Sequence, residues 1–173
     1  MTRSIRRAVR GIAAVGVPLA AAALAFAALG VASVQNDSMS PTLRGGELVL
    51  YDRWSVPTRG DIVLFVDREG WSGERDALLV KRIVGVAGDV ISCCEAGTGR
   101  LIVNGDPVDE DFAGDTRPGG DIPFRVTVPR DAVWVMGDNR AESADSRLSV
   151  SAPGHGAVAR ADLRGTARAW WSD

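Results

Sequence analysis

The chain has 173 residues, 46% of them apolar and 24% charged, which is the composition of one globular domain and not of a disordered segment. Its net charge is −2, but the first ten residues carry four arginines and no acid, so the remainder is distinctly acidic. An acidic body argues against nucleic acid as a partner. Two cysteines and one histidine are too few for a zinc finger, an HExxH site or a disulfide framework, so neither a metal nor a cofactor is expected.

Residues 11–34 contain no charged side chain and begin directly after the arginine cluster. As a helix, this run would be roughly 36 Å long, which exceeds the ~30 Å hydrocarbon core of a bilayer. The alternative is a cleaved secretory signal, cut near Gly30 and Ala32. The run is longer than the roughly 7 to 15 apolar residues of such signals, which favours a transmembrane anchor.

The arginines stay in the cytoplasm under either interpretation, because positive charge remains on that side of the membrane. The predicted organisation is therefore a cytoplasmic basic tail over residues 1–10, a transmembrane helix over 11–34 and an extracytoplasmic domain over 35–173. The expected location is the cell membrane, crossed once.

Short apolar or alternating runs, bounded by glycine, proline and aspartate, follow one another after residue 35 and predict a mostly β domain. Asn104 and Gly105 stand between two apolar runs and predict a tight hairpin, since both residues adopt positive φ readily. Residues 93–123 are rich in glycine, proline and acids and are expected to form a small inserted cap. The expected strands cover residues 47–51, 62–66, 78–86, 90–92, 101–103, 125–128 and 132–136.

Lys81 is the only lysine among twenty cationic side chains. Unlike arginine, lysine can release its proton, although at an ordinary pKa only roughly 1 in 2,500 such amines is neutral at pH 7. A general base needs a pKa about 3 units lower, and burial between the aliphatic neighbours Leu79 and Ile83 on one strand face supplies that shift. The alternative is a leftover surface charge in an arginine-rich composition.

Ser38 lies in a short polar stretch directly after the apolar run. Pro41 fixes its own φ and disfavours helix at Ser40, so the stretch is expected to hold Ser38 in an extended or turn conformation. A plain linker after a membrane segment is the alternative. A second polar cluster, residues 137–147, follows a predicted strand and either orients a catalytic group or caps a loop.

Other serine chemistries fit the sequence poorly. The chain has no G-x-S-x-G elbow, and no S-x-x-K motif pairs a serine with Lys81. A Ser-His-Asp triad would have to use His155, which stands between two glycines and is interpreted as a loop residue.

These stretches, taken in order, resemble the motifs of type I signal peptidases, the membrane-bound serine–lysine proteases that remove signal peptides from exported proteins. The resemblance covers nearly all of residues 34–169, including a hairpin at 103–105 and the ending at 163–167. The matching stretches are residues 38–43, 59–63, 80–85 with 88–89, and 137–140 with Ser143, Asp145, Ser146 and Arg147.

The resemblance implies a signal-peptidase-like β-sheet catalytic domain that cleaves exported preproteins after small residues, in an Ala-x-Ala pattern. It implies that Ser38 is the nucleophile and Lys81 the general base, acting through an acyl-enzyme intermediate. Its partners would be preprotein signal peptides and the lipid bilayer. The backbone N–H of Ser38 would donate a hydrogen bond to the oxyanion.

The resemblance also implies roles for residues around this pair. Ser143 would hydrogen-bond to Lys81 and orient it. Asp145 and Arg147 would form a structural pair that supports the site.

Three more residues receive expected roles from the same resemblance: Asp138 and Asn139 would shape the same wall, and Met39 would help to line the substrate cleft. The chain departs from many bacterial members by placing Asn36 and Asp37 before the nucleophile, where those members have Ser-Gly and use the serine hydroxyl as a second oxyanion donor. Asn36 would replace that donor through its amide, or the site would rely on backbone and water.

Two features stay open. The adjacent Cys93 and Cys94 form either a strained disulfide or two thiols, with no catalytic role. Trp54 and the pair Trp170-Trp171 rest either at the membrane interface or in the core. Two functional alternatives remain: a dedicated processing peptidase of conjugation or pilus type with the same dyad, and a catalytically silent membrane-anchored binding homologue.

Overall fold

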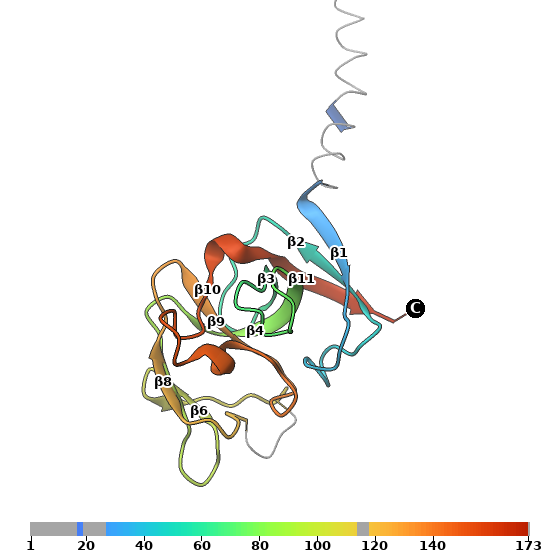
Figure 1. Cartoon of the computed structure of the whole chain (residues 1–173). Coiled ribbons are helices and arrows are strands. Elements are labelled where there is room, and N and C mark those ends of the chain that lie inside the picture. The colour runs from blue at the N-terminus through green and yellow to red at the C-terminus, as the bar shows by residue number, and fades with distance from the viewer. Residues whose placement is uncertain (1–16, 19–26, 114–117, 173) are drawn as a thin grey trace, which may run out of the picture.

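The computed structural model describes residues 17–18, 27–113 and 118–172. They build two antiparallel sheets (Figure 1), so the expectation of a mostly β domain is confirmed. The larger, seven-stranded sheet has the order β1-β2-β11-β3-β4-β9-β10, and the smaller, four-stranded sheet has the order β7-β6-β5-β8. The strands of the larger sheet are β1 (Leu29–Ser33), β2 (Leu48–Asp52), β3 (Ile62–Val66), β4 (Leu78–Val86), β9 (Ala132–Met136), β10 (Val158–Ala159) and β11 (Leu163–Trp171). The strands of the smaller sheet are β5 (Val90–Cys93), β6 (Leu101–Val103), β7 (Asp106–Pro107) and β8 (Phe124–Thr127), and two 3-10 turns are η1 (Ser146–Ser149) and η2 (Arg160–Asp162).

All seven expected strands are present, three of them displaced by one residue at one or both ends. The sequence prediction missed β1, β10 and β11, whereas β7 is the second arm of the predicted hairpin. The longest of these, β11, pairs with both β2 and β3, and its register shifts once against each neighbour. Such irregularities interrupt the two-residue alternation by which a strand is recognised in a sequence.

The N-terminal apolar run does not remain helical to residue 34. Residues 27–28 are helical, but β1 begins at Leu29 and pairs with β2 from Leu29 opposite Asp52 to Ser33 opposite Leu48. The predicted helix is therefore wrong over its last residues, because an open sheet edge offers their backbone a complete ladder of hydrogen bonds. Within the described residues, no helix is long and apolar enough to span a membrane, and residues 1–16 and 19–26 lie outside that description.

The smaller sheet is built by residues 90–127, which contain the predicted insert 93–123. Its β6–β7 hairpin turns at Asn104 and Gly105, whose φ angles of 56° and 98° confirm the prediction made from that pair. The two sheets share one core, in which Trp134 of β9 packs against Phe124 of β8 with ring centroids 4.8 Å apart. Gly85 lets the sheets pack closely at this junction, because a Cβ there would lie 2.3 Å from the Ile91 Cδ1 and would displace that side chain.

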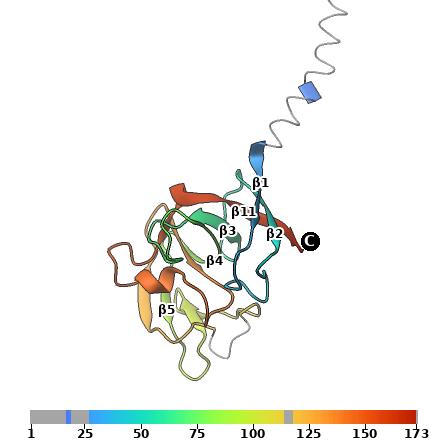
Figure 2. The same ribbon diagram turned by 45° about the vertical axis from the view of Figure 1, so that its right-hand side comes forward.

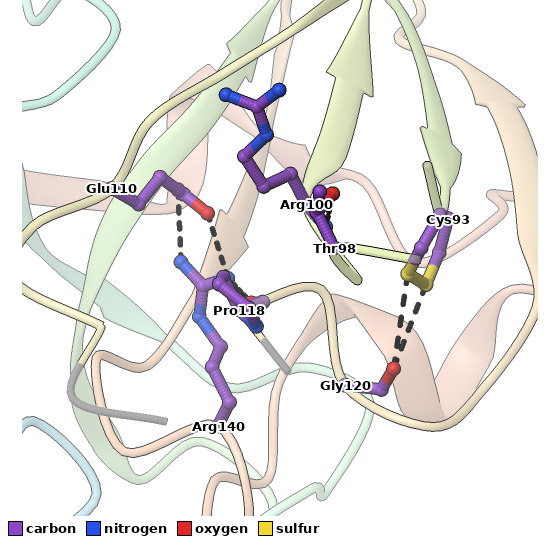
Figure 3. The surroundings of a disulfide bond; sticks show 8 residues. Cys93, Thr98, Arg100, Glu110, Pro118, Gly120 and Arg140 are labelled. Atoms are coloured by element: carbon purple, nitrogen blue, oxygen red, sulfur yellow. Dashed lines mark hydrogen bonds and ion pairs between the residues drawn. A yellow bond between two sulfur atoms is a disulfide. The ribbon is translucent and has the colours of Figure 1, made fainter. Parts of the chain in front are cut away.

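Cys93 and Cys94 form a disulfide with each other at the end of β5 (Figure 3). Their sulfur atoms lie 3.7 and 3.8 Å from the carbonyl oxygen of Gly120. Near the disulfide, the buried Arg140 contacts both carboxylate oxygens of Glu110, at 2.8 and 2.9 Å, and the carbonyl of Pro118 (Figure 3). Glu110 and Pro118 lie between β7 and β8, so these contacts attach that part of the smaller sheet to the loop that follows β9.

Candidate active site

A groove of about 560 Å³ runs between two strand edges of the larger sheet. Residues 31–36, from β1 and the segment after it, line one side, and residues 77–81 of β4 and its approach line the other. β1 is the edge strand of its sheet. β4 pairs with β9 only from Arg82 onward, so residues 78–81 have a partner on one side alone. Both walls of the groove therefore expose unpaired backbone groups.

Ser38 and Lys81 meet at this groove. Ser38 lies in the tight turn after β1, where the Ser40 N–H donates to the Asp37 carbonyl at 3.0 Å, and Lys81 lies in β4 opposite Val63. The Lys81 Nζ donates to the Ser38 Oγ at 2.7 Å and to the Val80 carbonyl at 3.1 Å. Both side chains are buried, with 6% of Ser38 and 3% of Lys81 exposed.

Burial lowers the pKa of Lys81 from 10.5 to about 8, and the charges of Asp145 and Asp138 partly oppose that shift. No carboxylate forms a salt bridge with Lys81 in the described part of the chain. With such a pKa, roughly 1 in 10 molecules carries a neutral Lys81 at pH 7. The arrangement thus provides what a hydroxyl nucleophile needs, an adjacent amine that is able to accept its proton.

Asp145, which is wholly buried, supports the loop behind this pair. Its carboxylate accepts two hydrogen bonds from the Arg147 guanidinium, both at 2.9 Å, and one from the Gly137 N–H at 3.0 Å. Arg147 also donates to the carbonyl of Arg140 at 2.8 Å. Gly137 tolerates no side chain, because a Cβ would lie 2.3 Å from the Ser38 carbonyl oxygen. This close contact fixes Ser38 against the loop after β9.

Asp138 anchors the same loop from the other side. Arg82 donates to both of its carboxylate oxygens, at 2.9 and 2.6 Å, and the Thr42 hydroxyl donates to one of them at 2.6 Å. Asn139 then holds the serine turn directly, through its N–H to the Ser38 carbonyl at 3.1 Å and its side-chain amide to the Asp37 carbonyl at 3.2 Å. Asp138 and Asn139 therefore lie beside the Ser38 turn.

The structure places Ser143 and Met39 differently from what the sequence predicted, and the oxyanion role of Asn36 stays a prediction. The Ser143 hydroxyl accepts the Gly137 N–H at 3.1 Å and makes no hydrogen bond to Lys81 in the described residues, because its oxygen is directed at the backbone of the loop after β9. Met39 is fully buried in a core cluster beneath the groove and does not line it, since its apolar side chain is better covered by neighbouring core residues than by solvent. Asn36 lines the groove, and its side-chain oxygen accepts the Ser38 N–H at 3.1 Å.

The sequence prediction assigned no role to Thr42, Arg82 or Arg140, although each stands inside a stretch that carries the resemblance. Arg82 follows Lys81 and therefore points to the opposite face of β4. The alternation of side chains along β4 was the sequence signal that could have indicated a supporting role for Arg82. Its partner Asp138 could not be deduced from the spacing of the residues in the sequence.

His155 lies on a loop, with its Nδ1 2.9 Å from the Val150 carbonyl and no contact with the Ser38–Lys81 pair. Over the described ranges, no group of three potential metal ligands is present.

The family model for signal peptidase, peptidase S26, matches residues 6–171, and the chain belongs to this family. It is 32% identical over 158 residues to a probable signal peptidase I of Mycobacterium leprae, with 66% of this chain and 54% of that protein covered. It is 34% identical over 134 residues to signal peptidase I U of Bacillus subtilis, with 69% and 66% covered. The chain thus spans between about half and two thirds of the length of these relatives.

The fold is also similar to a crystal structure of a signal peptidase I from Enterococcus faecalis. The TM-score is 0.51 at 24% identity, and the match covers 65% of this chain and 97% of that chain. The fold expected from the sequence motifs is therefore confirmed for the β-sheet domain.

Proposed function

We propose that this protein is a membrane-anchored signal peptidase I, a serine endopeptidase that removes signal peptides from exported preproteins. The observation that carries the proposal is the buried Lys81 Nζ at 2.7 Å from the Ser38 Oγ, on the wall of a groove. Family membership and relatives named signal peptidase I give the substrate class.

The chemistry follows from the pair. Neutral Lys81 accepts the Ser38 proton as the oxygen attacks the scissile carbonyl, and the resulting ammonium protonates the leaving amine. A water then attacks the acyl-enzyme by the same route. The Ser38 N–H becomes an oxyanion donor once the Asn36 side-chain oxygen releases it. Asp138, Asp145, Arg147 and Asn139 hold the geometry, and no step requires a metal or cofactor.

The groove suits an extended peptide. Residues 31–34 and 78–81 both present strand edges, so a substrate segment between them gains backbone hydrogen bonds on two sides. Aliphatic side chains such as Val34, Val49 and Leu79 line the groove, which favours small apolar side chains such as Ala in the substrate. We therefore propose cleavage after Ala-x-Ala.

We propose that residues 11–28 supply the membrane anchor, with the N-terminal arginines in the cytoplasm and the β domain outside. β1 favours an anchor over a cleaved signal, because cutting after Ala32 would remove four of its five residues, including Val31 and Ala32 of the groove wall. Anchoring holds the site near the surface where a preprotein's cleavage site emerges, which raises the effective substrate concentration.

The test uses the full chain in detergent or liposomes, with a preprotein that carries an Ala-x-Ala site, and determines product masses. We expect cleavage after the second Ala by the wild type and by Ser40→Ala, whose serine makes no side-chain hydrogen bond in the described region. Ser38→Ala and Lys81→Ala should give no product. Cleavage by Ser38→Ala would refute the dyad, and a folded wild type without activity would point to a narrow-substrate peptidase or a silent homologue.

A further inference from the structure

A second cavity, of about 250 Å³, lies away from the groove, between the loop after β2 and the start of β11. Parts of residues 53–57 and 160–166 line it. In Figures 1 and 2, these segments lie on the side of the domain where β1 begins. The link to the N-terminal segment is direct, because the Arg53 guanidinium donates to the carbonyls of Ala27 and Leu29 at 2.8 and 2.9 Å.

Three arginines share this cavity, namely Arg53, Arg160 and Arg164. None of them pairs with a carboxylate within the described ranges, and the Arg160 side chain has no hydrogen bond there at all. Arg164 donates only to the carbonyls of Ala161 and Leu163.

The nearby carboxylates do not neutralise these arginines. Asp52 is paired with Arg168, and Asp162 with Arg68. The cavity thus has an uncompensated positive charge with free N–H donors.

Thr166, which lines the same cavity, gives an independent indication of a ligand. Its side chain is 1% exposed, and its hydroxyl is the only buried side-chain polar atom without a hydrogen-bond partner in the part of the chain that the structure describes. An unsatisfied buried hydroxyl costs about 1 to 3 kcal/mol. The hydroxyl has almost no accessible surface, so an anion in the cavity would accept its hydrogen bond after the Thr166 side chain turns toward the cavity, and the arginine guanidinium groups would hold the anion there.

We propose that this cavity binds a phosphate group, and that the phosphate is that of an anionic lipid headgroup. Planar guanidinium groups match phosphate oxygens in pairs, and anionic lipids attract basic clusters at the membrane surface. Trp54 and Val56, beside the cavity, are 62% and 77% exposed, as befits side chains at a lipid interface. The lipid source rests on the proposed membrane anchor, whereas phosphate binding does not.

The experiment is a titration of the full chain in nonionic detergent micelles at constant ionic strength. One arm adds inorganic phosphate, and the other dopes the micelles with phosphatidylglycerol, with phosphatidylcholine as the neutral reference. Binding is followed by tryptophan fluorescence and by the rise in Tm that a native-state ligand produces. We expect phosphatidylglycerol to bind more tightly than free phosphate and phosphatidylcholine to have no effect.

The double variant R160Q/R164Q should weaken both interactions about tenfold or more, since each charge-assisted hydrogen bond contributes strongly. The matched control R125Q removes an exposed arginine of β8 and should leave both affinities unchanged. Thr166→Val should keep or raise the Tm without ligand and weaken phosphate binding several-fold, because it removes an unpaired hydroxyl at constant shape.

Equal affinities in R160Q/R164Q, R125Q and wild type would overturn the proposal. Phosphate binding without phosphatidylglycerol binding would retain the anion site and overturn its assignment to lipid. Because the readout is binding, an inactive protein that still binds phosphate refutes only the proposed function, and an active protein that does not bind refutes only this site.

Discussion

Lys81 and the two carboxylates behind it, Asp138 and Asp145, are all buried, yet their surroundings differ in kind. Each carboxylate accepts two hydrogen bonds from one arginine and a further bond from a neighbouring group. Among the residues that the structure describes, Lys81 has no carboxylate partner, and its amine donates hydrogen bonds only to a hydroxyl and a carbonyl. A buried charge that is paired fixes structure, whereas an unpaired buried amine tends to lose its proton.

This difference in pairing gives the Asp–Arg pairs a structural role and Lys81 a chemical one. The Asp–Arg pairs hold the loop after β9, and through Gly137 and Asn139 that loop holds Ser38. The lysine is left free to change its charge during a reaction. The comparison therefore predicts that altering Lys81 abolishes chemistry and that altering the Asp–Arg pairs lowers stability first.

The largest effect is expected from Lys81→Arg. The variant keeps the positive charge but cannot act as a base at working pH, so activity should fall by roughly 10⁴-fold or more. Steady-state cleavage assays check this, with circular dichroism to establish that the variant is folded. Activity within about tenfold of wild type would show that the lysine acts through its charge alone.

Asp145→Asn tests the paired side of the comparison. It leaves the buried Arg147 without its carboxylate, which should cost about 3 to 5 kcal/mol of unfolding free energy. Because the Asp145 charge raises the pKa of Lys81, the variant's pH profile of kcat/KM should also move to lower pH. Thermal unfolding and the pH profile measure the two effects, with the exposed Asp111→Asn as control. An unchanged Tm would contradict the structural role.

Lys81→Met should stabilise the protein while it removes activity. Burial lowers the folded-state pKa from 10.5 to about 8, so the unfolded chain binds the proton more tightly, and at pH 7 this difference costs about 3 kcal/mol. In the wild type, the free energy of unfolding should therefore be reduced most below pH 8, and this penalty from Lys81 should disappear as the pH rises toward 10.5. Urea unfolding across this range checks the sign, and the advantage of Lys81→Met should shrink as pH rises.

The smallest effect is expected from Asn139→Ala. It removes the side-chain hydrogen bonds to the Asp37 carbonyl and Glu142, but the backbone N–H to the Ser38 carbonyl remains. We expect a loss of about 0.5 to 1.5 kcal/mol in stability and a decrease in kcat of less than about tenfold. Activity as low as that of Lys81→Arg would mean that Asn139 takes part in the chemistry.

Most strands of the fold and the two central residues of the site could be predicted from the sequence. The expected strands are short apolar or alternating runs, the Asn104-Gly105 turn has its own backbone signature, and a lone lysine on an aliphatic strand face indicated a buried amine. The resemblance to type I signal peptidases then implied that Ser38 and Lys81 would meet, although they are 43 residues apart.

The features that the sequence did not predict depend on tertiary contacts, which the spacing of residues along the chain does not reveal. β1 looks apolar enough for a helix and becomes a strand only because the edge of β2 is free. Met39 is adjacent to the nucleophile, yet it packs in the core because the turn directs it inward. Ser143 bonds to Gly137 and Asn36 to Ser38, and both choices depend on which donor the fold brings within reach.

The most direct test of the central claim is the pKa of Lys81 itself. Because the chain has one lysine, protein labelled with ¹³C-lysine should give a single lysine Cε resonance, which can be followed between about pH 6 and 11. A titration with its midpoint near pH 8, in a folded and active sample, is the predicted result. A midpoint near 10.5 would show that the amine remains an ordinary ammonium and would contradict its role as the base.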